Sequence, residues 1–194
     1  MGNREDLLAG ARRCLREKGY ARTTVRDIST AAGVSMAAIG YHFGSKEALL
    51  TEALAGETRD WGAELERALA DSPADDPDPL RRWETRWDAV LGTIATHPGV
   101  WSATFDALAA PETREQLAAG ADEARSGLAR LLNGDEESDD RAAATVGALT
   151  QALLIGVAAQ YLIDPGNAPT GRDLADGLRR IMRQDPGSGA PPRE

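Results

Sequence analysis

Residues 24–49, TVRDISTAAGVSMAAIGYHFGSKEAL, gather side chains that are suited to contact a phosphate backbone. Lys and Arg side chains can neutralise phosphates, while hydroxyl and imidazole groups can donate hydrogen bonds that fix a register. The chain has no legible Ser/His/Asp arrangement, no HExxH sequence and no Walker phosphate loop, and its second histidine, His97, is far from the first. The chemistry indicated is nucleic-acid contact, and we expect no enzyme activity, no metal and no cofactor.

Capping residues and glycine divide this segment into two short helices. Thr24 is a good N-cap, and Asp27 three residues later can complete an approximate capping box. Gly33 ends the first helix where a left-handed turn is needed, and Ser35 caps a second helix over residues 36–41. Two helices joined by a short turn that contains glycine form the layout that sets a recognition helix in a DNA major groove.

Apolar residues at helical spacing give each of these helices a stripe to bury. In the two short helices and the corner between them, the stripe consists of Val25, Ile28, Ala31, Ala32, Val34 and Ile39. A supporting helix precedes them and closes at Gly19; its stripe consists of Leu7, Leu8, Ala11, Cys14 and Leu15. We expect these side chains to be structural.

The run TTVRDISTAAGVSMAAIGYHFGSKEALL resembles the N-terminal signature of the tetracycline-repressor (TetR) family of bacterial transcriptional regulators. The resemblance covers roughly residues 4–50, and the YHF-x-SKEALL tail makes it more specific than a bare helix-turn-helix. The rest of the chain is similar to the family only in length and helical character. The resemblance implies an all-α fold of about nine helices, with a three-helix DNA-binding domain and a helical ligand-binding and dimerisation domain.

The DNA contacts of the family carry over to matching positions of this sequence. Positions that touch phosphate are matched by Thr24 and Arg26, and positions that reach base edges by Ser35, Met36, Ala37 and Ala38. Backbone contacts are matched by Tyr41, His42 and Lys46, the last at a helix N-terminus whose amides also face phosphate. Phe43 is expected in the core, and Tyr41 can either touch DNA or pack inside.

Two features depart from the family pattern. Gly40 stands where the family commonly carries a larger, often aromatic side chain, and glycine inside a helix costs about 0.5–1 kcal/mol relative to alanine. The reading face also lacks Arg, Lys, Asn and Gln, which make bidentate contacts to guanine or adenine. We therefore expect Met36, Ala37 and Ala38 to read thymine methyl groups, with DNA shape supplying further selectivity.

The formal net charge of −9 divides unevenly along the chain. Residues 1–50 carry a net charge of +3 and the remainder −12, which would present the N-terminal end to DNA; solubility is another use of the acidic body. A single cysteine, Cys14, fits a reducing cytoplasm and a small core residue better than a redox sensor. No signal-peptide pattern is visible and no stretch approaches the ~20 apolar residues of a membrane span, so a cytoplasmic protein without a membrane partner is expected.

Helical patterns continue through the body of the chain. We expect a long helix from Ser45 to about residue 70, then helices over about 79–95, 99–109, 112–132, 139–163 and 170–184. The acidic run 135–140 should be a solvated connector. The expected domains are a DNA-binding domain over residues 1–50, a ligand-binding and dimerisation domain over 51–184, and a disordered tail over 185–194.

The helix over 139–163 has apolar groups on more than one face, which indicates that it packs both inward and against something else. In the family, the last two long helices pair with their copies in a four-helix dimer interface. Small residues would allow such a close approach here: Ala142, Ala143, Ala144, Gly147, Ala148, Gly156, Ala158 and Ala159. The other interpretation is intramolecular core, but a homodimer on a palindromic double-stranded operator is favoured because one short reading helix is poorly selective.

Aromatic side chains indicate where a small molecule could enter. Trp83 and Trp87 share one helix face, and Trp101 and Phe105 share another, so they could line an apolar pocket for an apolar or aromatic effector; ordinary core is the alternative. Gln151 could orient such a ligand, as could Asp88 and Thr104.

The sequence thus favours a DNA-binding transcriptional regulator, a repressor released from its operator by a small-molecule ligand. The alternative is a helical small-molecule-binding protein whose sequence-specific DNA binding is weak or lost, which Gly40 and the donor-poor reading face motivate. Selection from random DNA separates the two.

Overall fold

A computed structural model describes residues 2–73, 76–113, 118, 124–131 and 140–183, and all the regular elements in these ranges are helices. The N-terminal bundle contains α1 (Gly2–Lys18), α2 (Val25–Ala32) and α3 (Met36–Phe43). The body contains α4 (Lys46–Ala70), α5 (Pro79–Thr96), α6 (Pro98–Ala109), a 3-10 turn (Pro111–Thr113), α8 (Asp140–Ile163) and α9 (Gly171–Arg183). Residues 124–131 are also helical. The predicted all-α fold is confirmed.

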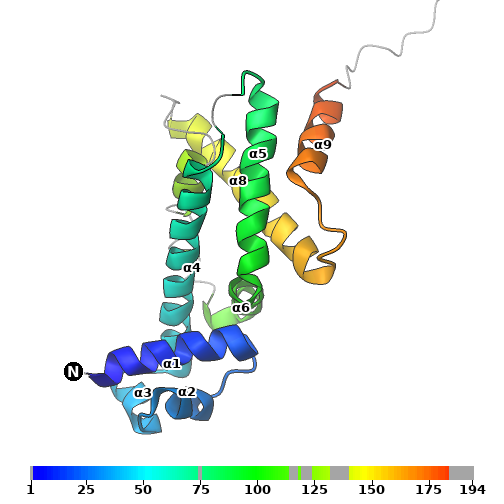
Figure 1. The fold of residues 1–194 in the computed structure, drawn as a ribbon. Helices are drawn as coiled ribbons and strands as arrows, with labels where there is room; N and C mark the ends of the chain where they lie inside the picture. Colours follow the sequence, from blue (N-terminus) through cyan, green and yellow to red (C-terminus); the bar gives the residue numbers. More distant parts are fainter. Residues whose placement is uncertain (1, 74–75, 114–117, 119–123, 132–139, 184–194) are drawn as a thin grey trace, which may run out of the picture.

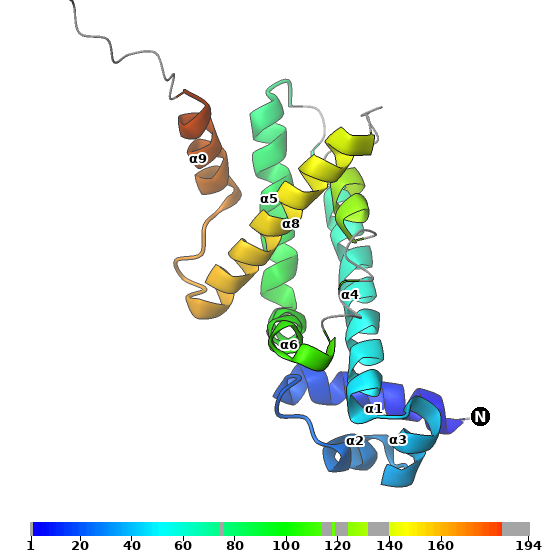
Figure 2. The same ribbon diagram turned by 180° about the vertical axis from the view of Figure 1, so that it is seen from behind.

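The bundle and the body are joined by α4, which begins beside α3 and runs up the length of the body (Figure 1). The helix α1 lies across the lower end of the body, with α2 and α3 beneath it, while α4 and α5 stand upright above. From behind, α8 crosses α5 obliquely as the outermost layer, and α9 lies beside α5 (Figure 2). The predicted DNA-binding helices and the helices of the predicted ligand-binding domain therefore lie at different levels along the long axis of the molecule.

One apolar core holds the bundle together. Leu7 and Leu15 of α1, Ile28 of α2 and Ile39 of α3 are all buried in it, as the apolar spacing predicted. The same core includes Leu49, Leu50, Ala53 and Leu54 of α4 and Ala103 and Ala107 of α6. The bundle core thus continues past residue 50 and draws on the body, because α4 is a single uninterrupted helix.

A second core fills the body. Its buried members come from α4, α5, α6 and α8, and include Trp61, Trp87, Trp101, Leu154 and Val157. The chain then turns, and α9 docks on α5 through the amide of Gly171, which donates to Asp88 Oδ1 at 2.8 Å. Any side chain at Gly171 would collide with the Glu84 carbonyl, since a Cβ would lie 2.3 Å from it.

Most helix boundaries agree with the sequence to within two residues. The second reading helix is longer than predicted and ends at Phe43, because the amide of Gly44 still bonds to the Gly40 carbonyl. The predicted helix over 112–132 is described only at residues 118 and 124–131. Most of the acidic connector and the whole predicted disordered tail lie outside the described residues.

The expectation that no stretch could span a membrane is wrong by length and composition. The segment Arg141–Ile163 of α8 is long and apolar enough, with a mean hydropathy of 1.7. Its seven alanines contribute hydropathy without bulk, which is why the stretch does not look like a Leu- and Phe-rich span. Only 28% of it is buried within the chain. A core helix of a soluble protein meets the same criterion.

Candidate DNA-binding interface

The first reading helix is fixed at its N-terminus by the predicted capping box. The Thr24 hydroxyl accepts from the Asp27 amide at 3.2 Å, and the Asp27 carboxylate accepts from the Thr24 amide at 2.9 Å. Lys18 at the end of α1 donates to the same carboxylate at 2.5 Å. The Lys18 ion pair, followed by the Thr24 hydrogen bonds, holds the pKa of Asp27 well below its ordinary value. The turn before α2 is therefore tied to α1 by charge as well as by packing.

The corner between α2 and α3 has the geometry that its glycine predicted. Gly33 adopts φ 67°, a left-handed conformation that favours glycine, and its amide bonds to the last turn of α2. The Ser29 hydroxyl donates to the Val34 carbonyl and closes the corner. Ser35 occupies the N-cap position of α3, but its side chain makes no capping hydrogen bond. The hydroxyl of Ser35 thus remains exposed and able to reach a ligand.

The outer side of α3 carries few donors. Met36 is 55% exposed, Tyr41 is 85% exposed, and Ala37 is also exposed, so all three point away from the bundle core. Ala38 and Phe43 are both partly buried and pack against that core, so Phe43 lies at the edge of the core rather than within it. His42 is half-buried, with its ring edge-on to the Tyr41 ring at 4.9 Å. Fewer side chains of α3 are therefore available to a DNA groove than the sequence predicted, because Ala38 packs against the bundle core.

The side chains predicted to contact phosphate differ in whether they already make hydrogen bonds or ion pairs within the chain. Arg26 is exposed and makes no hydrogen bond or ion pair to any part of the chain that the structure describes. Thr24 is engaged in the capping box. Lys46 Nζ donates to the Thr23 carbonyl at 3.2 Å and lies 3.4 Å from Glu47 Oε1. Arg26 is thus ready to meet a phosphate, whereas Lys46 must first exchange an internal contact.

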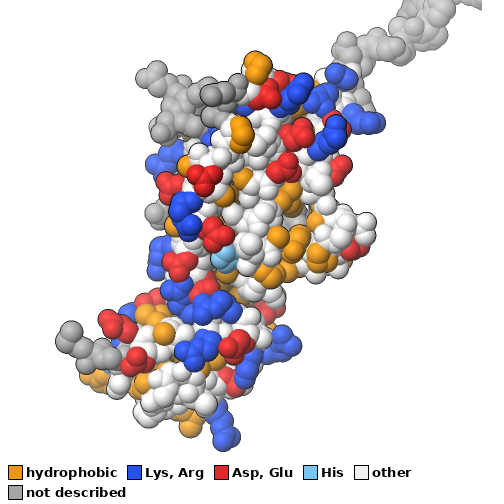
Figure 3. Space-filling model, in the orientation of Figure 1, with side chains coloured by type: hydrophobic (Ala, Val, Ile, Leu, Met, Phe, Trp, Pro, Cys, Tyr) orange, Lys and Arg blue, Asp and Glu red, His pale blue; other side chains and the backbone are white. Residues whose placement is uncertain are grey.

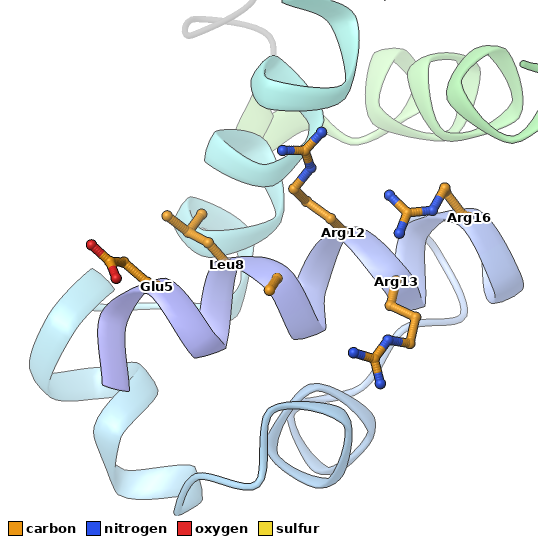
Figure 4. A pocket seen from close by; sticks show the side chains of 6 residues that line it. Glu5, Leu8, Arg12, Arg13 and Arg16 are labelled. Atoms are coloured by element: carbon orange, nitrogen blue, oxygen red, sulfur yellow. The ribbon is translucent and has the colours of Figure 1, made fainter. Parts of the chain in front are cut away.

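Basic and acidic side chains are interspersed over both the bundle and the body on the face drawn in Figure 3. A shallow hollow on the surface of α1 is lined by Glu5, Leu8, Ala9, Arg12, Arg13 and Arg16 (Figure 4). This hollow lies on the bundle, away from the aromatic side chains that were predicted to form a ligand pocket.

Two arginines of α1 connect the bundle to the body, and sequence reasoning missed this contact. Arg12 Nε and Arg16 Nη1 both donate to Glu57 Oε1 of α4 at 2.5 Å, and the Glu57 side chain is only 7% exposed. Arg12 also bonds to Asp60, and these two acceptors raise the pKa of Arg12. Forty or more residues separate the partners, so no local pattern could have revealed the pairing.

A further connection joins α6 to the start of the reading unit. Asp106 Oδ2 accepts from the Ala21 amide at 3.2 Å, in the turn between α1 and α2. At the other end of α6, a Cβ on Gly99 would lie 3.3 Å from the Arg16 carbonyl, so α6 and the C-terminal end of α1 are in close contact. These two contacts connect α6 to the turn before α2 and to the end of α1.

The predicted ligand-binding side chains fall in or against the body core. Trp87 and Trp101 are buried, whereas Trp83 and Phe105 are partly buried and pack against them. The Trp83 and Trp87 rings lie 5.5 Å apart, which confirms their shared face. Gln151 is half-buried on α8. Asp88, by contrast, holds the N-terminus of α9, and Thr104 bonds to its own helix at the Val100 carbonyl, so both have structural partners.

The structure also distributes the small residues of α8 between two surfaces. Gly147 is buried, and a Cβ there would lie 2.6 Å from the Arg125 carbonyl; Ala158 is fully buried. These two belong to the chain's own core, contrary to their predicted place in a dimer interface. Ala142, Ala144 and Ala148 remain exposed. Cys14 is buried in the bundle, where desolvation raises the pKa of its thiol, in keeping with its predicted structural role. Within the described ranges no group of three or more His, Cys, Asp or Glu side chains could hold a metal ion.

The chain is similar to known transcriptional repressors, most clearly in its N-terminal segment. Residues 7–53 match the model of bacterial regulatory proteins of the tetR family. Over 49 residues the chain is 49% identical to the transcriptional repressor AcnR of Corynebacterium efficiens, a match that covers 25% of this chain and 26% of AcnR. It is 33% identical to the transcriptional repressor Rv1474c of Mycobacterium tuberculosis over 75% of this chain and 64% of that protein.

Solved structures extend the likeness to the whole chain. The complex of triclosan with SmeT, a repressor from Stenotrophomonas maltophilia, aligns over 100% of both chains with a TM-score of 0.58 and 22% identity. That identity supports a shared fold only. The matched segments span about a quarter of AcnR and less than two thirds of Rv1474c. By its helix-turn-helix sequence, the segment 7–53 belongs to the tetR family of bacterial regulatory proteins.

Proposed function

We propose that this protein is a dimeric transcriptional repressor that leaves a palindromic operator when a small molecule binds in its body. The observation that carries this function is the exposed outer side of α3, with Met36, Ala37 and Tyr41 directed away from a well-packed bundle. The free guanidinium of Arg26 supplies a phosphate contact beside it. The named relatives AcnR and Rv1474c are transcriptional repressors, which supports the direction of regulation.

The second copy is proposed to cover α8 and α9. Exposed apolar or small side chains recur along α8 at helical spacing, at Ala142, Val146, Leu149, Ala152 and Ile163, and α9 adds Ile181 and Met182. This face is the open side of the body in Figure 2. Apolar surface of that extent is covered in a soluble protein, and two-fold pairing also places two reading helices on one duplex.

The ligand is proposed to act by shifting a population between two spacings of the reading heads. The body contacts the bundle through two sets of hydrogen bonds, from Glu57 to α1 and from Asp106 to the Ala21 amide. A ligand that separates α4 or α6 from its neighbours would therefore move α1. A ligand with equal affinity for both spacings would change nothing. SmeT is a structural neighbour solved with triclosan, which supports a small-molecule site in this fold.

The domain division that we propose assigns DNA reading to residues 1–50 and binding of the effector and the second copy to residues 51–184. The bundle core itself extends beyond this boundary, to Leu54 of α4. Absence of catalysis and a cytoplasmic location remain predictions that accompany a DNA-binding repressor.

Selection of bound duplexes from random DNA tests the proposal. We expect a palindromic winner, bound by two chains, and a large loss of affinity when one half-site is scrambled. Binding that is weak, sequence-independent and steeply salt-sensitive would instead support the small-molecule-binding protein that has lost its operator.

A matched pair of variants then tests the interface. Arg26→Gln should lower affinity for every operator variant alike and reduce the slope of log affinity against log salt by about one per chain. Arg81→Gln removes the same charge from a side chain that is 69% exposed on α5, distant from the bundle, and should leave affinity and slope unchanged. Equal effects of the two variants would show that the response reflects net charge rather than a contact.

A further inference from the structure

Arg86 of α5 carries a positive charge that the described chain does not neutralise. Its Nη2 donates to the backbone carbonyl of Leu131 at 3.1 Å, and its Nε is buried with no hydrogen-bond partner. Within the described ranges no carboxylate lies close enough to form an ion pair with it. Three arginines of α1 are neutralised by carboxylates: Arg4 pairs with Glu52, and Arg12 and Arg16 pair with Glu57.

The geometry of the guanidinium group defines what is missing. Nε and Nη2 lie on one edge of the planar group and together form a fork that matches the two oxygens of a carboxylate. In Arg86, Nη2 donates to a neutral carbonyl, and Nε has no acceptor. A guanidinium group keeps its proton at any physiological pH, so the side chain cannot relieve this mismatch by becoming neutral. A carboxylate would supply the acceptor that Nε lacks while also pairing with Nη2.

The surroundings of this fork are apolar and aromatic. Trp83 and Trp87 flank Arg86 on the same helix, and Leu131 packs against the body core. Trp101 Nε1 is a second buried donor without an acceptor in that core. In contrast, Trp61 Nε1 donates to the Thr93 hydroxyl at 3.2 Å. Unpartnered buried donors are uncommon in native proteins, so each of these two groups lacks an acceptor that a bound molecule could supply.

We propose that Arg86 is the anion-recognition residue of the effector site, and that the effector is an apolar or aromatic carboxylate. This inference rests on the proposed function and narrows its ligand from apolar molecules in general to acids. The two carboxylate oxygens accept from Nε and Nη2, and the apolar part lies against the Trp83 and Trp87 side. Because the carboxylate takes the place of the Leu131 carbonyl, binding releases the 124–131 helix from α5, which gives the ligand a structural effect on the body.

Four acid and amide pairs serve as probes: octanoate, phenylacetate, 1-naphthoate and biphenyl-4-carboxylate, each with its neutral carboxamide. Calorimetric titration of the full-length protein at pH 7.5, without DNA, should show at least one acid binding ten-fold or more tightly than its amide. Arg86→Gln should abolish that preference, and Arg86→Lys, which keeps the charge but loses the fork, should reduce it. If no acid binds better than its amide, or if both variants keep the wild-type preference, the inference is wrong.

The control is Arg82→Gln, one turn earlier on α5. Arg82 Nη1 donates to the Asp76 carbonyl at 2.7 Å, so this variant removes a comparable charge and a comparable hydrogen bond to a backbone carbonyl. It should leave the acid preference intact. Thermal unfolding without ligand separates a binding role from a structural one: Arg86→Gln should unfold at the wild-type temperature or higher, because it removes an unsatisfied buried donor. A drop well beyond that of Arg82→Gln would assign Arg86 to structure and overturn the inference.

Operator binding is measured separately by fluorescence anisotropy. If the wild type binds a palindromic operator but no acid, only the inference about Arg86 fails. If acids bind in the Arg86-dependent manner while no operator is found, the proposed repressor function fails and the carboxylate site stands.

Discussion

Individual side chains determine what the reading surface can distinguish. The exposed side of α3 presents a thioether, a methyl group and a phenol from Met36, Ala37 and Tyr41, together with the free hydroxyl of Ser35. Such groups discriminate bases through apolar contact with the thymine methyl more readily than through bidentate hydrogen bonds. Ala38 packs against the bundle core, so Met36 and Ala37 are the positions at which this contact is expected.

Replacing thymine by uracil in the operator tests this contact. Burial of one methyl group contributes about 0.8 kcal/mol, so each contacted thymine should lose about fourfold in affinity on substitution. Equilibrium anisotropy on otherwise identical duplexes measures the change. Met36→Ser should weaken binding to the thymine duplex and shrink the difference from uracil, whereas unchanged affinity for a fully uracil-substituted operator would exclude methyl readout.

The charge on Asp27 makes the bundle sensitive to acid. The pKa of this carboxyl lies below its ordinary value of 3.8, mainly because Lys18 and Thr24 donate to the ionised form. A group whose pKa is lower in the folded state stabilises the fold above its unfolded pKa, and the contribution is lost as the pH falls toward the folded pKa. We therefore expect the contribution of Asp27 to be complete at neutral pH and to decline below about pH 4.

Urea unfolding followed at several pH values between neutrality and strong acid checks this expectation. Asp27→Asn should be less stable than the wild type at pH 7, and the two should converge as the pH falls, because Asn cannot pair with Lys18. The control is Asp6→Asn, which changes an exposed carboxyl with no partner among the described residues. A constant gap between the wild type and Asp27→Asn at all pH values would show that the charge plays no part.

At the scale of elements, glycines mark where the helices of the bundle approach one another and where they do not. Gly10 of α1 lies so close to α2 that a Cβ would be 2.9 Å from the Ala32 amide nitrogen. Gly40 of α3 faces open space, and nothing lies within 4 Å of the position that its Cβ would occupy. A methyl group at Gly10 would therefore collide with α2, whereas a methyl group at Gly40 would meet no other atom.

Alanine at each position separates backbone propensity from packing. Gly40→Ala should raise the free energy of unfolding by about 0.5–1 kcal/mol, because it removes the entropic cost of glycine within a helix. Gly10→Ala should lower it by about 1–3 kcal/mol, because α1 and α2 must separate to admit the methyl group. Chemical denaturation with circular dichroism measures both. Destabilisation by Gly40→Ala would mean that the position has a conformational requirement that the helix does not show.

The elements that the sequence predicted well are those whose signals are local. Thr24, Asp27 and Gly33 act on residues three to five positions away, so the cap and the corner could be predicted, and both are confirmed. The Arg12–Glu57 and Asp106–Ala21 contacts join helices that are distant in sequence and depend on how α1 crosses α4 and α6. The inward side of α8 also depended on tertiary packing, since alanine and glycine suit a core and an interface equally. Gly147 and Ala158 were accordingly assigned to the wrong surface.

At the scale of the whole molecule, the body buries the apolar side chains of its core but leaves apolar side chains of α8 exposed to solvent. The described chain buries α5 between α4, α8 and α9, yet leaves Leu149 60% exposed and Ile163 83% exposed on α8. The same helix is apolar enough to satisfy the length and composition of a membrane span. The proposed second copy would account for both observations, since pairing α8 and α9 with their counterparts would remove this surface from water.

A charge placed at the centre of this face tests the arrangement at the level of the assembly. Leu149→Glu should convert the dimer to monomer, because two-fold symmetry brings two carboxylates into an apolar contact where neither has a partner. Sedimentation velocity measures the shift, and operator affinity should fall sharply with it, because a monomer presents only one reading helix. Leu108→Glu makes the same change on α6, at a side chain that is 42% exposed, and should leave both mass and affinity unchanged. Because Leu149 lies on the surface of the chain, the helical content and the fold of the isolated subunit should survive its replacement. A monomer that still bound the operator with wild-type affinity would break the link between pairing and recognition, while a dimer that persisted in Leu149→Glu would place the second copy on a different face.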